Sequence, residues 1–204
     1  MNDLEIACAL KAPLIIGASV SADLRAPSPG RILSRRYTDE NSIRVVAERG
    51  RKCCDILQRI KAKDLDGSTI VIGIDLLFWD SFARDCSEAV TELNRLCAYL
   101  SRKNIPLVLG DIPALVPTLQ PSRPVLNRAL AEAGQMPGVY VVSLDQIYMD
   151  IVINGSIYFE GRLLSVDDLT PDGLHFSDVA SRFIADGIFS ALSLDHRQPN
   201  FLTI

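Results

Sequence analysis

The chain has 204 residues, of which 48% are hydrophobic and 23% charged, and its formal net charge is −4. This composition predicts one globular domain spanning residues 1–204, long enough to bury a core without disulfides or a metal. The acidic net charge argues against nucleic-acid binding. The longest apolar runs fall short of the roughly 18 residues that a membrane span requires.

Cysteines and the N-terminus indicate the cellular setting. The five cysteines are an odd number without C-x-x-C spacing, which indicates neither a disulfide framework nor a zinc site. Residues 1–5 carry acids where a secretory signal carries bases, and the apolar stretch after them is expected to be the first core strand. We therefore expect a cytoplasmic protein without metal or cofactor.

Short apolar runs alternate with longer amphipathic segments along the whole chain. In order, the apolar runs and helical patterns fall at 14–16, 30–37, 43–47, 52–63, 69–74, 82–103, 106–110, 122–133, 139–143 and 177–194. The runs are rich in Val, Ile and Leu, as strands buried on both faces of a parallel sheet are. Strand–helix alternation repeated five times predicts an α/β fold with a doubly wound parallel sheet and right-handed crossovers.

Glycine and polar residues follow four of the predicted strands. Ser19, Gly50, Asp75 and Asp111 each come shortly after an apolar run. Because ligands of such folds bind at the carboxyl ends of the strands, we expect these residues to share one edge of the sheet. Asp111 is expected to act there as a hydrogen-bond acceptor of the loop rather than as an acid catalyst.

The segment at 151–166 breaks the alternation. Asn154-Gly155 lies there between two apolar runs, a pattern that predicts a hairpin turn. We expect this excursion to pack near the loop at 172–175 and to form one wall of a pocket. Further upstream, Asp80 or Ser81 is expected to cap the helix at 82–103.

Asp172 precedes His175, one of only two histidines, by three residues. At that spacing a carboxylate can hold one imidazole nitrogen, which leaves the other free to take a proton from a nucleophile. Ser19, after the first strand and a turn glycine, is the candidate nucleophile. The other histidine, His196, lies in a polar tail and is expected to face solvent. The pattern points to a serine hydrolase.

With these residues the chain resembles the SGNH (GDSL-type) hydrolase/esterase family over almost its whole length. The family block Gly-Asp-Ser-Leu-Ser/Thr corresponds to Gly-Ala-Ser-Val-Ser at 17–21, and its Asp-x-x-His block to Asp-Gly-Leu-His at 172–175. The resemblance implies a three-layer, flavodoxin-like α/β/α sandwich with five parallel strands and hydrolysis of esters, thioesters or acetylated sugars. It also implies a triad in which Ser19 is the nucleophile, His175 the base and Asp172 the orienting carboxylate.

The resemblance further implies an oxyanion hole made by Ser19, Gly50 and position 75. The family has Gly-x-Asn after the third strand, where this chain has Gly-Ile-Asp at 73–75. An ionised Asp75 can accept hydrogen bonds but cannot donate one to an oxyanion. Three alternatives follow: the amides of Ser19 and Gly50 suffice, Asp75 points elsewhere, or Asp75 is protonated in a dry pocket and donates. The family's other aspartate, replaced by Ala18, is outside the triad, so its loss is tolerable.

We expect acyl transfer through an acyl-enzyme intermediate on a small-molecule ester. The lack of a long apolar lid favours small acyl groups, and the loop at 112–120 is expected to set pocket depth together with the excursion at 151–166. One alternative is a catalytically impaired binding protein of the same fold. Another is a metal-dependent phosphohydrolase using Asp75, Asp80 and Asp111, although the chain offers no convincing nucleophile motif or histidine ligands for it.

Overall fold

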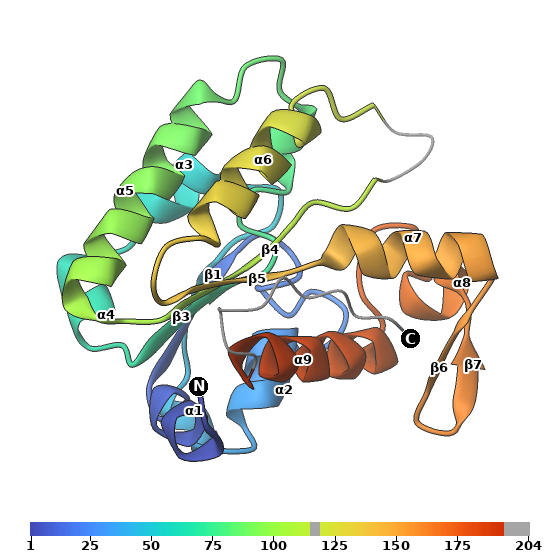
Figure 1. Ribbon diagram of the computed structural model, residues 1–204, viewed down its shortest axis with the longest axis horizontal. Coiled ribbons are helices and arrows are strands. Elements are labelled where there is room, and N and C mark those ends of the chain that lie inside the picture. The colour runs from blue at the N-terminus through green and yellow to red at the C-terminus, as the bar shows by residue number, and fades with distance from the viewer. Residues whose placement is uncertain (115–118, 194–204) are drawn as a thin grey trace.

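The computed structural model describes residues 1–114 and 119–193 and has a five-stranded parallel sheet at its centre (Figure 1). The strand order is β2-β1-β3-β4-β5. The strands are β1 (Pro13–Gly17), β2 (Arg44–Ala47), β3 (Ile70–Gly73), β4 (Leu107–Gly110) and β5 (Val139–Val142). Every strand agrees within one residue at each end with the apolar run that predicts it, which confirms the doubly wound arrangement.

Helices cover both faces of the sheet and make a three-layer α/β/α sandwich (Figure 1). One layer contains α3 (Cys53–Leu57), α4 (Ala62–Asp66), α5 (Ser87–Lys103) and α6 (Arg123–Ala133). The other layer contains α1 (Asp3–Ala9), α2 (Pro29–Ser34) and α9 (Asp178–Ser193). The fold class inferred from the sequence is therefore confirmed.

Successive strand residues point to opposite faces of the sheet and supply two separate cores. In β3, Ile70 and Ile72 join the cluster under α1, α2 and α9, whereas Val71 joins the cluster under α3, α5 and α6. All three side chains are buried. Because both faces of the sheet are covered, the inner strands β1, β3 and β4 are buried at every position, which explains their unbroken apolar runs, whereas the edge strand β2 is only half-buried.

The parallel register brings the carboxyl ends of the strands to one edge. Gly17 of β1 lies opposite Ala47 of β2, and Gly73 of β3 lies opposite Leu109 of β4. The segments that carry Ser19, Asp75 and Asp111 leave the sheet at this edge. The edge is therefore where the sequence places the functional residues.

The apolar stretch that follows residue 5 is helical, so the expectation of a strand there is wrong. Asn2 and Glu5 make a capping box at the start of α1: the Asn2 side chain accepts from the Glu5 N–H at 3.0 Å, and the Glu5 carboxylate accepts from the Asn2 N–H at 2.8 Å. This box satisfies N–H groups that the first turn of a helix leaves unpaired. Ile6 and Leu10 then pack into the core beside α9.

Asn154-Gly155 ends a helix rather than turning a hairpin. Residues 144–154 form α7 (Leu144–Asn154), and Gly155, with φ of 76°, provides the left-handed residue that commonly follows a helix. The hairpin lies just beyond, with β6 (Ile157–Phe159) and β7 (Arg162–Leu164) joined through Glu160 and Gly161. Both signals contain a glycine with positive φ, so the local sequence does not separate them.

Two predicted helices are interrupted, and Asp80 caps a different helix from the one expected. The segment at 52–63 divides between α3 and α4, and η2 (Trp79–Phe82) precedes α5 as a separate turn. The Asp80 carboxylate accepts from the Cys53 N–H at the start of α3, at 2.9 Å, whereas the Ser81 hydroxyl donates to the Phe78 carbonyl. The remaining short helices are η1 (Glu40–Ser42) and α8 (Val166–Leu169).

The segments α7, β6, β7 and α8 pack on α9 around a third, smaller core (Figure 1). Its buried members are Ile151, Leu164, Leu169, Val179 and Ala180. The predicted excursion therefore packs against α9, and the loop at 172–175 follows it in the chain. Part of the loop at 112–120 and the whole tail that holds His196 lie outside the described residues. Among the described helices, none is both long and apolar enough to cross a membrane.

Candidate active site

Ser19 lies in a tight turn directly after β1. Two backbone hydrogen bonds close this turn: the Ala22 N–H donates to the Ala18 carbonyl at 3.0 Å, and the Leu24 N–H donates to the Ser19 carbonyl at 3.2 Å. Gly17, with φ of 146°, leads into it. A Cβ at Gly17 would lie 2.2 Å from an Asp75 oxygen, so only glycine permits this close approach.

Asp75 holds the turn from the end of β3. One carboxylate oxygen accepts from the Ala18 N–H at 3.1 Å and from the Ser21 hydroxyl at 2.6 Å. The other oxygen accepts from the Val20 N–H at 2.8 Å. Burial raises the pKa of Asp75, and the hydrogen bonds from Ser21, Val20 and Ala18 oppose that rise. The carboxylate thus fixes the residues on both sides of Ser19.

This placement corresponds to the alternative in which Asp75 points away from an oxyanion. Both of its oxygens are directed at the turn, and its hydrogen-bond partners are donors. The Ser19 N–H and the Gly50 N–H have no acceptor among the residues that the structure describes. These two amides remain able to donate to a ligand.

Gly50 lies in the exposed loop after β2. Its φ is 71°, and a Cβ added there would meet no atom within 4 Å. The Glu48 N–H donates to the Gly17 carbonyl at 3.1 Å, which ties the start of this loop to the end of β1. The loop is therefore anchored beside the turn that carries Ser19.

Residues 172–175 bring a histidine to Ser19 from the other end of the chain. His175 Nε2 lies 3.0 Å from Ser19 Oγ, and His175 Nδ1 lies 2.8 Å from Asp172 Oδ2. Asp172 Oδ1 also accepts from the backbone N–H groups of His175, at 2.7 Å, and Leu174, at 3.1 Å. With its proton on Nδ1, the imidazole donates to Asp172 and can accept from the serine.

The Asp172 carboxylate is kept ionised at neutral pH. Partial burial raises its pKa, but hydrogen bonds from the His175 N–H, the His175 ring and the Leu174 N–H outweigh that effect. The net result is a pKa well below the usual value of an aspartate. A fixed negative charge at Nδ1 selects the tautomer that leaves Nε2 open towards Ser19.

Arg25 is a neighbour of this group that the sequence did not suggest. Its guanidinium Nε lies 2.8 Å from Asp172 Oδ2, the same oxygen that faces His175 Nδ1. Leu24, Arg25 and Ala26 line one small pocket together with Ser19 and His175. Ser19 is only 4% exposed and His175 only 8%. A lone arginine in a loop carries no motif, so only the fold could reveal this contact.

The carboxylates considered for a metal centre are used elsewhere. Asp111 accepts from the Asp145 N–H at 2.8 Å, which makes it the expected loop acceptor at the start of α7, and Asp80 accepts from Cys53. Burial raises the pKa of Asp111 to about 6. Within 1–114 and 119–193, no three His, Cys, Asp or Glu side chains are grouped so as to hold a metal ion.

No protein-family model and no curated protein matches this sequence. Solved structures do match its fold. A lipase/acylhydrolase from Enterococcus faecalis aligns over 93% of this chain and 100% of its own, with a TM-score of 0.63 and 18% identity. The esterase EstA from Pseudoalteromonas sp. aligns over 88% of this chain and 95% of its own, with a TM-score of 0.59 and 18% identity. The acetylxylan esterase Axe2 from Geobacillus stearothermophilus aligns over 94% of this chain and 100% of its own, with a TM-score of 0.61 and 12% identity.

These likenesses establish the architecture. At identities of 12–18% they show that the chain shares the α/β/α fold of these proteins. An activity does not follow from a fold alone, because one fold serves many chemistries. The function has to be argued from the site itself.

Replacing Asp75 by asparagine should destabilise the protein by about 1–3 kcal/mol, because an amide nitrogen would then face backbone N–H donors that now have an acceptor. Urea unfolding at neutral pH measures this loss. Asp39→Asn is a matched control, since Asp39 is exposed and makes no capping hydrogen bond. Equal stabilities of Asp75→Asn and wild type would contradict the anchoring role.

Asp111→Asn should flatten the dependence of stability on pH. The folded-state pKa of Asp111, about 6, lies above the ordinary value of 3.8, so the folded protein holds this proton more tightly than the unfolded chain. Wild type therefore loses stability as pH rises from about 4 to about 6, and asparagine has no proton to lose. Urea unfolding across this range compares the two proteins. Parallel curves would show that Asp111 is not the group responsible.

Proposed function

We propose that this protein is a carboxylic ester hydrolase that acts through Ser19, His175 and Asp172. The observation that carries the proposal is the continuous contact from Ser19 Oγ through His175 Nε2 and Nδ1 to Asp172, at 3.0 and 2.8 Å. A hydroxyl, an imidazole and a carboxylate in that order form the arrangement that activates a serine nucleophile.

In the proposed reaction, His175 takes the Ser19 proton while the serine oxygen attacks the ester carbonyl. The Asp172 carboxylate stabilises the imidazolium that forms, and the protonated imidazole then donates its proton to the leaving alcohol. Water, activated by the same imidazole, attacks the acyl-enzyme, releases the acid and restores Ser19. Each proton is returned, so the cycle needs no cofactor.

Backbone amides supply the proposed oxyanion hole. The N–H groups of Ser19 and Gly50, which have no acceptor among the described residues, are the proposed donors, although Gly50 lines neither pocket. Asp75 acts in this scheme as a positioning residue, because it holds Ala18 and Val20 and so orients the amide between them. Preorganised amides of this kind stabilise the charge that develops on the carbonyl oxygen.

The structural neighbours support the reaction class by analogy. The three described above are a lipase/acylhydrolase, an esterase and an acetylxylan esterase. One EstA structure is described as inhibited by monoethylphosphonate. A phosphonate is therefore a suitable probe of Ser19, since it reacts with an activated serine in place of an ester.

Wild type should form one covalent adduct with a fluorophosphonate, and Ser19→Ala and His175→Ala should form none at the same exposure. Hydrolysis of p-nitrophenyl acetate should fall by roughly four orders of magnitude or more in both variants, because the triad acts as a unit. Intact mass and initial rates measure the two effects. Ser190→Ala, on the exposed side of α9, is the matched control and should behave as wild type.

The failure of this experiment has a defined meaning. A folded wild-type protein that gives neither an adduct nor turnover would overturn the hydrolase proposal. The catalytically impaired binding protein would then be favoured, with the Asp75 carboxylate at the position of a missing donor as its physical reason.

A further inference from the structure

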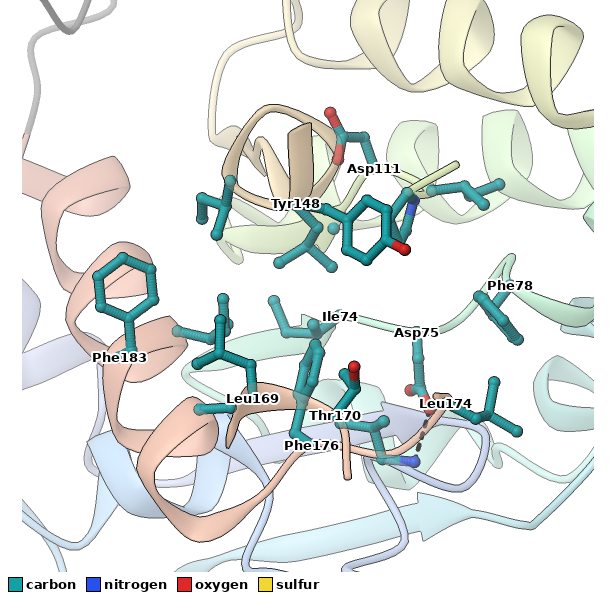
Figure 2. Close-up of a pocket in the computed structure, with 18 of the residues that line it drawn as sticks. Ile74, Asp75, Phe78, Asp111, Tyr148, Leu169, Thr170, Leu174, Phe176 and Phe183 are labelled. Atoms are coloured by element: carbon teal, nitrogen blue, oxygen red, sulfur yellow. Dashed lines mark hydrogen bonds between the residues drawn. The ribbon is translucent and has the colours of Figure 1, made fainter. Parts of the chain in front are cut away.

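A large apolar pocket lies beside the triad, between the carboxyl ends of β3 and β4 and the helices α7, α8 and α9 (Figure 2). Its empty volume is about 880 Å³, counting the space at its mouth that is open to solvent. Protein interiors are otherwise close-packed, so an apolar hollow beside Ser19 and His175 needs an explanation.

The pocket adjoins the surroundings of Ser19. Val20 and Phe176 line both this pocket and the small one that contains Ser19 and His175. In Figure 2, Asp75 and Leu174 lie towards one end of the pocket, and Leu169 and Phe183 towards the other. Since Leu174 adjoins His175 in the chain, this end of the pocket is the one next to the triad, and the other end is lined by α8 and α9.

The walls present little that a polar ligand could use. Among the described lining residues, the two carboxylates, Asp75 and Asp111, already accept backbone N–H groups, and the Thr170 hydroxyl donates to the Val166 carbonyl. Tyr148 contributes its ring and a hydroxyl from α7 (Figure 2). The remaining surface is aliphatic, aromatic or glycine, which suits a chain of methylene groups and offers few partners to water.

We propose that this pocket holds an aliphatic chain of the ester that Ser19 attacks, so that the substrates are esters with a medium or long apolar chain. The inference rests on the proposed hydrolase function and deepens it. It replaces the expectation of small acyl groups, which was drawn without α7 and α8, two of the helices that line the pocket. Each methylene transferred from water into such a site increases binding by up to about fourfold.

The apolar chain of an ester is carried by its acyl or its alcohol part, so substrates are varied on each side. One series is p-nitrophenyl acetate, butyrate, octanoate and laurate, in which only the acyl group grows. The other compares ethyl acetate with octyl acetate, in which only the alcohol grows. In wild type, kcat/KM should rise by at least tenfold from the short to the long member of one of these series.

Val166→Phe tests the location of the chain. Val166 lines the pocket from α8, and a phenyl ring there should fill part of the pocket. We expect kcat/KM for the long ester to fall at least tenfold and kcat/KM for p-nitrophenyl acetate to change by less than twofold. Val125→Phe is the matched control, since Val125 is 55% exposed on α6 and does not line the pocket. Ile147→Phe, from α7, repeats the test if Val166→Phe fails to fold.

Two results would overturn the proposal: rates that do not increase with chain length in either series, or a loss on Val166→Phe that is equal for short and long esters. Either result, obtained on an enzyme that turns over acetate, leaves the hydrolase function standing.

Binding separates the pocket from the chemistry. Dansyl-labelled undecanoic acid should bind Ser19→Ala, and the added Val166→Phe should weaken that binding by at least tenfold. If this holds while wild type gives neither adduct nor turnover, the hydrolase function fails and the pocket remains. If the labelled acid does not bind, or binds both proteins equally, the pocket proposal fails by itself.

Discussion

The bonds between the Asp75 carboxylate and the turn around Ser19 are the constraint on which the candidate site depends. Asp75 follows β3 and Ser19 follows β1, so the carboxylate bridges the ends of two neighbouring strands. It takes up the N–H groups of Ala18 and Val20 and leaves that of Ser19 unused. The bridge is possible because Gly17 has no side chain where the carboxylate lies. A buried acceptor with several donors resists displacement, because each bond lost leaves an unpaired polar group.

Asp172 and His175 are brought to this turn by the helix layer that contains α9. This helix packs against α2 and β5, and α2 begins only a few residues after the turn that carries Ser19. The same packing brings the loop at 172–175 to the edge of the sheet, although 156 residues separate Ser19 from His175. Asp172 then fixes the ring through its own hydrogen bonds to the backbone of the loop. The serine and the histidine are thus each held by a carboxylate, one buried and one partly exposed.

The features that could be predicted from the sequence are those that a local residue pattern determines. All five strands were predicted because burial on both faces requires unbroken apolar runs, and the pairing of Asp172 with His175 follows from a three-residue spacing. The backbone partners of Asp75 could not be predicted, because Ala18 and Val20 contribute only N–H groups, which every sequence possesses. Arg25 was missed for a related reason, since a single charge in a loop has no period. The helix α7 was missed because Gly155 suits a helix end and a hairpin equally. A pocket with the excursion at 151–166 as one wall was expected, and Ile151 and Val166 do line it, but the apolar surface that α7 adds was missed with the helix.

The exchange of an amide for a carboxylate at position 75 has two opposing consequences. Losing a donor to the oxyanion of the proposed reaction costs about 3 kcal/mol, and a buried negative charge nearby adds to that cost. Against this, a displacement of about 1 Å in a reacting group costs roughly a hundredfold in rate, which is close to 3 kcal/mol. A carboxylate that holds Ala18 and Val20 protects against such a displacement of Ser19, and an asparagine has only one oxygen with which to do so. The two effects are of similar size. In the proposed reaction, position 75 contributes by orienting the Ser19 amide, and that amide is the group that meets the developing charge.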